Sequence, residues 1–384
     1  MQFEFATAPR IVFGPGCSKG IPELAARMGT SICLVIGGSS GRVQWAIDGL
    51  TEKGFTPHIV SISGEPDIGT ISLKADAARQ AGCDSVVAIG GGSVLDAGKA
   101  LAALLTNHGD ILDYLEVIGK GQPLTHPPVP LITVPTTSGT GSEVTSNAVL
   151  LSPSHGVKVS MRSPEMIPNI AVIDPELTKD MPPTLTAATG MDALTQLMEA
   201  FVSNKANPMT DALCREGMLR AARSLHVAYT DGLNSTARED MALASLFSGI
   251  ALSNAKLGAV HGFAAPLGGE FKTPHGAVCA ALLPSVMKVN IKALRQRKAD
   301  SPSLNAYAET AVILTGDMHA TPEDGIKWVR ELCTKMSIPT LGSMRVTQAH
   351  FSDLADKAAA ASSMKGNPVL LSKDELLTIL TLAL

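Results

Sequence analysis

The stretch Ser85-Val86-Val87-Ala88-Ile89-Gly90-Gly91-Gly92-Ser93 decides the fold class of this chain. An apolar strand-length run ends in three glycines and a serine, and a helical pattern from Val94 to Leu105 follows at once. Such a turn brings backbone N–H groups and the positive end of a helix dipole to one point, which suits a phosphate. The alternative is a tight turn whose glycines only supply positive φ angles. We favour the phosphate site.

The same strand–helix alternation extends to both sides of this stretch. Further strands are predicted at Ser31–Ile36, His58–Ile62, Leu131–Val134 and Ile170–Ile173, and further helices at Val43–Lys53 and Ile71–Ala81. Strands that are apolar on both faces need helices on both sides of a parallel sheet. We therefore predict an α/β dinucleotide-binding domain with a Rossmann-like parallel sheet over residues 1–182.

Beyond Pro182-Pro183 the pattern becomes helical. Helices are predicted at Ala187–Ser203, Met209–Thr230, Ala237–Asn254, Ala277–Val289, Pro322–Lys335 and Lys373–Leu384. Few alternating β-type runs interrupt them. We predict a second, all-α domain over residues 183–384.

The composition excludes several classes of protein. The 384 residues carry a formal net charge of −4, which disfavours a constitutive nucleic-acid or anionic-membrane binder. The first ten residues do not resemble a signal peptide, and the longest uncharged stretch, 121–142, is too rich in Pro and Thr for a membrane span. Six cysteines without a C-x-x-C pair favour free thiols. We expect a cytoplasmic protein with a small-molecule substrate.

The end of the 31–36 strand indicates which dinucleotide would be preferred. A site for NAD usually carries Asp or Glu there, which binds the ribose hydroxyls and repels a 2′-phosphate. This chain has Gly38, Ser39 and Ser40, with Arg42 close behind. Small hydroxyls and a cation predict a preference for NADP(H), with NAD(H) as the alternative.

Several ordered motifs resemble those of the iron-containing (group III) alcohol dehydrogenases. They are Gly90-Gly91-Gly92-Ser93-x-x-Asp96-x-x-Lys99, Pro135-Thr136-Thr137-x-Gly139-Thr140-Gly141-Ser142-Glu143, Gly190–Thr195, and His261-Gly262 with Pro274-His275-Gly276. The resemblance covers essentially the whole chain. It implies a dehydroquinate synthase-like architecture with the active site in the cleft between the domains. It also implies reversible hydride transfer between a nicotinamide cofactor and an alcohol–carbonyl pair, usually in a dimer or larger homo-oligomer.

The resemblance also implies the residues that bind the cofactor. The glycine turn would hold the pyrophosphate, the threonines would lie near the cofactor, and Lys158 would reach the ribose. Together with the strand-end positions, the predicted set is Gly38, Ser39, Ser40, Gly91, Gly92, Ser93, Asp96, Thr136, Thr137, Thr140 and Lys158.

The metal site departs from the family at one position. The family pattern is an Asp, a His four residues later, and two further His fourteen residues apart. Asp192, His261 and His275 fit this pattern, but Gln196 replaces the first His. Gln196 still shares a helix face with Asp192, although an amide oxygen is a poorer ligand than imidazole for Fe²⁺ or Zn²⁺. We expect these four residues to bind Fe²⁺ or Zn²⁺; the alternative is a polar cluster without metal.

A second departure is Ala265, where many family members have a His assigned to proton handling. No catalytic residue is therefore identified beyond the metal ligands. Two other functions stay open. One is metal-independent reduction, as in maleylacetate reductases, with Lys205, Lys256 or Lys272 meeting the substrate carboxylates. The other is a non-catalytic dinucleotide-binding protein.

Overall fold

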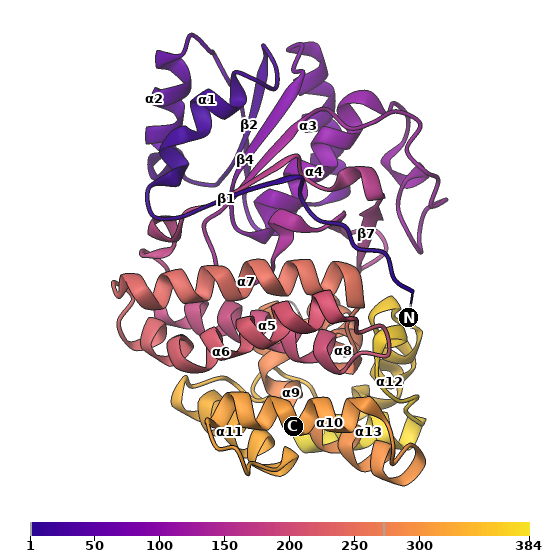
Figure 1. Ribbon diagram of the computed structural model, residues 1–384. Helices are drawn as coiled ribbons and strands as arrows, with labels where there is room; N and C mark the ends of the chain where they lie inside the picture. The colour runs from indigo at the N-terminus through magenta and orange to yellow at the C-terminus, as the bar shows by residue number, and fades with distance from the viewer. Residues whose placement is uncertain (1, 272) are drawn as a thin grey trace. The chain divides into compact units, whose positions relative to one another are not determined.

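The computed structural model describes residues 2–271 and 273–384, which form two compact units. The α/β unit comprises residues 7–137 and 141–178, and the helical unit comprises residues 2–6, 138–140 and 179–384. Figure 1 shows the sheet with its helices in indigo to magenta and the long helices in rose to yellow. The predicted fold class, a Rossmann-like sheet followed by an all-α domain, is confirmed.

The sheet of the α/β unit has six strands in the order β1-β8-β5-β4-β2-β3, and every neighbouring pair is parallel. From β2 the chain runs outward to β3, then returns to β4 on the other side of β2. Open α/β sheets bind ligands beyond the carboxyl ends of the strands at such a reversal. The strands are β1 (Arg10–Phe13), β2 (Ile32–Gly37), β3 (His58–Ile62), β4 (Ser85–Gly90), β5 (Leu131–Pro135) and β8 (Ile170–Ile173).

Alternate residues of β2 explain why helices cover both faces of the sheet. Cys33 and Val35 pack with α3 (Ile68–Gln80) and α4 (Gly92–Thr106). Ile32, Leu34 and Ile36 point the other way and pack with α1 (Ile21–Ala25) and α2 (Gln44–Glu52). Figure 1 shows these two helix pairs on opposite sides of the strands.

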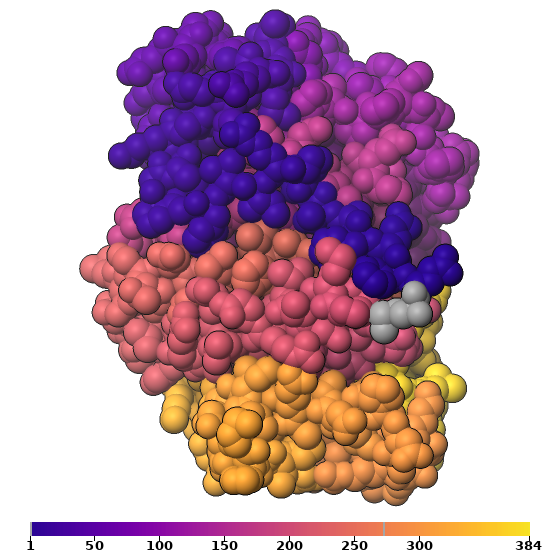
Figure 2. Space-filling model, viewed as in Figure 1, coloured from indigo at the N-terminus to yellow at the C-terminus, as the bar shows by residue number. Residues whose placement is uncertain are grey.

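The helical unit is built around α5 (Pro183–Val202), of which all but a few residues near the N-terminus are buried. Its core consists mainly of Ala, Leu, Met and Val side chains. Figure 2 shows that side chains fill the gaps that the ribbon leaves between the helices of this unit. The other long helices are α6 (Pro208–Thr230), α7 (Ser235–Ala255), α8 (Ala259–Phe271), α9 (His275–Arg297), α10 (Pro302–Thr315), α11 (Pro322–Lys335), α12 (Phe351–Ala360) and α13 (Lys373–Ala383).

Helix α9 is long and apolar enough to cross a membrane by composition, and α7 with α8 passes the same test as a pair bent by 103°. However, 83% of the apolar window of α9 is buried within the protein. This burial fits a core helix.

The structure contains elements that the sequence patterns did not predict. Strands β6 (Asn147–Ser152) and β7 (Val157–Arg162) form an antiparallel hairpin, and helices α8, α10 and α12 lie between the predicted helices. Helix α8 matters most for function because it carries His261. Its sequence holds Pro266 and three glycines, which are residues that usually mark a loop.

Candidate active site

Helix α5 carries three polar side chains along one of its own faces, inside the helical unit. Asp192, Gln196 and Glu199 are spaced by four and three residues, so they lie one above another along the helix. All three are almost fully buried. Buried polar groups persist only when other groups compensate them, and each of these three has a partner.

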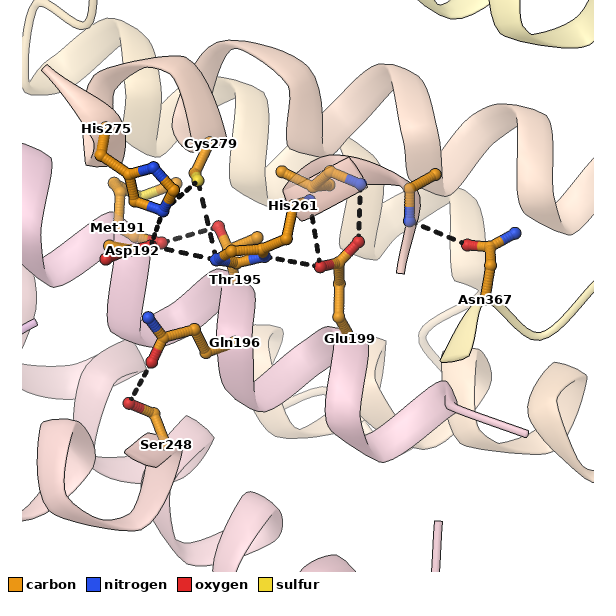
Figure 3. A network of polar contacts seen from close by, with 12 residues as sticks. Met191, Asp192, Thr195, Gln196, Glu199, Ser248, His261, His275, Cys279 and Asn367 are labelled. Carbon is orange, nitrogen blue, oxygen red and sulfur yellow. Dashed lines mark hydrogen bonds and ion pairs between the residues drawn. The ribbon is translucent and has the colours of Figure 1, made fainter. Parts of the chain in front are cut away.

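Two histidines and a cysteine from neighbouring helices meet Asp192 (Figure 3). His261 Nε2 lies 3.3 Å from Asp192 Oδ1, and His275 Nε2 lies 3.7 Å from the same oxygen. Cys279 Sγ lies 3.8 Å from His261 Nε2 and 3.7 Å from His275 Nε2. One ligand atom from each of these four residues lies within 4.8 Å of the others. We call this group the Asp-His-His-Cys cluster.

A glycine lets α9 approach α5 closely enough to form the cluster. His275 is the first residue of α9, and Gly276 follows it. A Cβ atom at Gly276 would lie 2.0 Å from the carbonyl oxygen of Ala188 on α5 and 3.2 Å from Asp192 Cβ. Any side chain at this position would therefore push His275 away from Asp192.

Glu199 fixes the orientation of His261. Its Oε2 lies 2.7 Å from His261 Nδ1, and its Oε1 accepts a 2.7 Å hydrogen bond from the backbone N–H of Val260. With Nδ1 on this carboxylate, Nε2 is the ring atom that faces Asp192 and Cys279 (Figure 3). A carboxylate behind a histidine is the usual arrangement at protein metal sites, where it orients the ring and raises its basicity.

Gln196 lies beside the cluster but its oxygen is already engaged. Oε1 accepts a 2.7 Å hydrogen bond from the hydroxyl of Ser248 on α7. Figure 3 shows the amide nitrogen pointing the other way, toward the side of α5 that carries Asp192. Binding of a metal through Oε1 would require the amide to turn, so that its nitrogen donates to Ser248. The Ser248 hydroxyl could then donate to the backbone oxygen of Ser245, which lies at 2.8 Å.

The charges of the cluster support one another. Burial acts to raise the pKa of Asp192, but His275 and His261 outweigh it and the pKa lies below its ordinary value. The pKa of His275 is raised to about 9. The Cys279 sulfur contributes most to this increase and Asp192 adds to it, whereas desolvation acts to lower the pKa. Asp192 and the two histidines thus favour each other's charged forms, whereas His261 acts to lower the pKa of His275.

The residues of the cluster fit a divalent transition metal. Two imidazoles and a carboxylate are a common ligand set for catalytic zinc, and Glu199 supplies the outer carboxylate. All donors except His275 are almost fully buried, whereas the His275 side chain is 42% exposed. The exposed side leaves an approach for a substrate.

In the α/β unit, the glycine turn connects β4 to α4 as predicted. Gly91 is the N-cap of α4, and no side chain caps the helix there. The position of a Cβ on Gly91 would be 3.4 Å from Thr137 at the end of β5, so Gly91 and Thr137 lie close together. An uncapped helix start beside hydroxyl groups can donate N–H bonds to a pyrophosphate.

At the end of β2, the polar residues predicted to bind the cofactor are solvent-exposed. Gly38, Ser39 and Ser40 follow the strand directly, and Arg42 lies in the short 3-10 helix Ser40–Val43. No acidic side chain occurs between Gly37 and Gln44. This end of β2 lies at the reversal of strand order, where a nucleotide ribose is expected.

Three other predicted cofactor residues have partners within the protein. Asp96 accepts hydrogen bonds from Ser142 Oγ at 2.5 Å and from a backbone N–H, and it pairs with buried Lys99 at 2.9 Å. Lys158, on β7, forms a 2.9 Å ion pair with Glu65. Thr140 also has an interaction within the protein, and it belongs to the helical unit. Cofactor contacts of these residues stay predictions.

Glu143 is buried in the α/β unit. Desolvation raises its pKa from 4.5 to about 7, although Lys99 acts to lower it. A raised folded-state pKa gives stability that is fully present below pH 4.5 and is lost as the pH rises through about 7. We expect Glu143→Gln to remove this loss, so that above pH 7 it gains up to about 3 kcal/mol over the wild type. Urea unfolding at pH 5 and pH 8 would measure it; an equal wild-type-to-variant difference at both values would contradict it.

Comparisons with known proteins agree over both units. A family model described as iron-containing alcohol dehydrogenase matches residues 8–175, and one described as Fe-containing alcohol dehydrogenase family, C-terminal, matches residues 186–384. The chain belongs to the iron-containing alcohol dehydrogenase family.

Individual relatives support this membership. A 1,3-propanediol dehydrogenase of Klebsiella pneumoniae is 34% identical over 376 residues, covering 96% of this chain and 95% of that protein. Alcohol dehydrogenase 4 of Schizosaccharomyces pombe is 35% identical over 332 residues, covering 86% and 76%. The crystal structure of a 1,3-propanediol oxidoreductase covers both chains completely with a TM-score of 0.93 and 32% identity.

Membership of the iron-containing alcohol dehydrogenases makes this chain an oxidoreductase that interconverts an alcohol and a carbonyl compound. The family uses NAD(P) and a divalent metal. The expectation of an enzyme is confirmed, and the non-catalytic alternative is set aside. Ala265 is exposed on α8 and offers no proton.

The lysines considered for a metal-independent reductase find no support. Lys205 and Lys256 are exposed just beyond the ends of α5 and α7. Neither belongs to the Asp-His-His-Cys cluster, and Lys272 lies outside the described residues.

Sequence reasoning missed two residues of this site, Glu199 and Cys279. Cys279 lies four residues after His275 on the same helix, and Glu199 lies seven after Asp192. Both spacings place the two residues of each pair on one helix face. The helical spacing could therefore have indicated that Cys279 lies near His275 and Glu199 near Asp192.

Proposed function

We propose that the chain is an NADP(H)-preferring, metal-assisted alcohol dehydrogenase or aldehyde reductase. The observation that carries the proposal is the meeting of Asp192, His261 and His275 in a buried cluster, with a carboxylate behind His261. Three protein ligands of these types, partly open to solvent, are typical of a catalytic metal site. We take these three residues as its core ligands.

The protein groups have separate tasks in this proposal. Asp192 supplies negative charge, His261 and His275 supply neutral donors, and Glu199 holds the ring of His261. A divalent ion bound there would act as a Lewis acid on the substrate oxygen. The sequence-based assignment of Gln196 as a further ligand holds only if the amide turns so that its oxygen leaves Ser248 and its nitrogen donates to Ser248 instead.

The cofactor site is proposed at the carboxyl ends of β2, β4 and β5. Gly91, Gly92 and Ser93 at the start of α4 would bind the pyrophosphate through backbone N–H groups, and Thr136 and Thr137 would add hydroxyl donors. Ser39, Ser40 and Arg42 would receive the 2′-phosphate of NADP(H).

Arg42→Ala tests the cofactor preference. Loss of one exposed cation at a phosphate should lower kcat/KM for NADPH about 10-fold or more, with that for NADH nearly unchanged, because charge-assisted hydrogen bonds contribute about 1.5–3 kcal/mol. Arg27→Ala, an exposed arginine away from the strand end, is the control. A wild-type kcat/KM for NADH well above that for NADPH would refute the preference.

The overall proposal is tested by steady-state assays on a panel of aldehydes and on maleylacetate, with and without chelator. We expect NADPH-linked reduction of an aldehyde that chelation abolishes and that Fe²⁺ or Zn²⁺ restores. Rapid turnover of maleylacetate that is insensitive to chelation would instead favour the metal-independent reductase.

We also propose that the enzyme acts in the cytoplasm as a homo-oligomer. The proposal is supported by its family membership and by six free cysteines, as in a reducing compartment. Light scattering on the purified enzyme at assay concentration measures the assembly; a strictly monomeric active enzyme would contradict the oligomer.

A further inference from the structure

Gln196 stands where the family's metal site has its first histidine, and Cys279, from a different helix, lies in the cluster with Asp192, His261 and His275. We propose that Cys279 binds the metal as a thiolate and completes the ligand set with Asp192, His261 and His275. The mixed sulfur–nitrogen–oxygen set then favours Zn²⁺ over the Fe²⁺ of the family's name. This inference rests on the proposed function, since it specifies the metal of the same site.

The distances among the four donor atoms carry the argument. A tetrahedral zinc with bonds of about 2.0–2.1 Å to N or O and about 2.3 Å to S separates its N and O ligands by about 3.3 Å and its S and N ligands by about 3.6 Å. In this protein the two N···O separations are 3.3 and 3.7 Å. The two S···N separations are 3.8 and 3.7 Å. All four lie within a few tenths of an ångström of the tetrahedral values.

The orientation of each donor points to the same centre. His261 Nδ1 is hydrogen-bonded to Glu199 Oε2, so the other ring nitrogen, Nε2, is directed at Asp192 and Cys279. His275 and Cys279 are one turn apart on α9, and both direct their ligand atoms at Asp192 (Figure 3). Cys279 is fully buried in the core of the helical unit, and its sulfur lies within 3.8 Å of two imidazole nitrogens.

Gln196 is the competing candidate for the fourth ligand. Its amide oxygen accepts a hydrogen bond from Ser248. Its amide nitrogen, which cannot bind a metal, faces the cluster (Figure 3). Cys279 needs no such turn, only the loss of a proton, which metal binding itself promotes.

The softness of sulfur sets the expected metal. Thiolate with imidazole in tetrahedral geometry is typical of zinc, whereas sites rich in oxygen and imidazole ligands accept iron more readily. Four protein ligands do not block catalysis, because catalytic zinc can expand to five ligands in the transition state. The His275 side chain is 42% exposed, so a substrate oxygen could approach a metal held by these residues from that side.

X-ray absorption at the zinc edge tests the proposal on the wild-type protein, reconstituted with one equivalent of Zn²⁺ after chelation. We expect one sulfur scatterer at about 2.3 Å together with N or O scatterers at about 2.0–2.1 Å. A zinc shell of N and O atoms alone would overturn the assignment of Cys279, while the proposed metal-assisted function would stand. Failure of the wild type to bind any divalent metal would instead overturn the proposed function.

Variants provide an independent test with a readout other than activity. Cys279→Ser should remove the sulfur-to-metal charge-transfer absorption of the Co²⁺-loaded protein and weaken Zn²⁺ binding about 100-fold or more, beyond the 10–100-fold cost of losing an outer partner. Cys214→Ser, a buried thiol on α6, is the matched control and should retain both properties. Gln196→Ala should also retain the absorption band.

These variants can also overturn the proposal. Retention of the band and of affinity in a folded Cys279→Ser protein would do so, as would loss of metal in Gln196→Ala alone. Since Cys279→Ser could fail to fold, Cys279→Ala serves as a second variant, and the zinc-edge measurement on the wild type needs no variant.

Discussion

Asp192→Asn is expected to lower kcat/KM for aldehyde reduction about 1,000-fold, corresponding to about 4 kcal/mol of lost transition-state stabilisation. Asp192 lies close to both histidines of the cluster, with Oδ1 at 3.3 Å from His261 Nε2 and 3.7 Å from His275 Nε2. Removing its charge takes away the only carboxylate in the Asp-His-His-Cys cluster. Bound metal should fall together with activity, which elemental analysis of the same sample would measure.

The control for this substitution is Asp211→Asn on α6. Asp211 is partly buried in the same unit, and desolvation raises its pKa, so neutralising it should preserve folding. We expect this variant to keep its metal and its activity. An Asp192→Asn enzyme that turns over at the wild-type rate without metal would show that Asp192 serves only the packing of α5.

Ser93→Asp is expected to raise KM for NADPH about 100-fold or more, because a like charge placed against a pyrophosphate costs several kcal/mol. Ser93 is in the first turn of α4, whose N-terminus has no side-chain cap. An aspartate there interacts favourably with the helix dipole, so the stability of the fold should be unchanged or raised by about 0.3–1 kcal/mol. Steady-state kinetics and thermal unfolding measure the two effects.

Opposite changes in cofactor binding and stability make Ser93→Asp informative. Ser93→Ala is the matched control, since it removes only one hydroxyl donor and should raise KM for NADPH no more than about 10-fold. If Ser93→Asp left KM unchanged in a stable protein, the pyrophosphate would have to bind somewhere other than the start of α4.

The strands and helices with strong periodicity could be predicted from the sequence. The predicted bounds of β3 and α11 agree with the structure, and β4, α3 and α4 differ by only a few residues. These segments have uninterrupted patterns because their apolar residues face a single sheet or core. The helical unit has its long segment from Lys179 onward and also includes residues 2–6 and 138–140, so the domain bounds 1–182 and 183–384 stay a prediction.

Helix α8 could not be predicted because its local sequence argues against a helix. Gly262, Pro266 and Gly268 lower helix propensity, yet its residues from Ala259 to Ala264 are all buried. Tertiary contacts outweigh propensity here: Glu199 and Asn367 accept hydrogen bonds from the first N–H groups of this helix. The β6–β7 hairpin was missed for a different reason, since its alternating residues follow directly on a polar loop.

The resemblance named three residues that the structure brings together, while their role as metal ligands stays a prediction. Asp192, His261 and His275 came from the resemblance, and the structure brings them together. Cys279 and Glu199 have no place in that pattern, and their meeting with the histidines depends on how α5, α8 and α9 pack.

The most direct test of the metal-assisted function is elemental analysis of the enzyme purified without chelator, followed by stepwise return of metal to the chelated enzyme. The account predicts about one divalent ion per chain, as for a single catalytic site, and aldehyde reduction that rises in proportion to metal bound. Full turnover by enzyme with no detectable metal would contradict it.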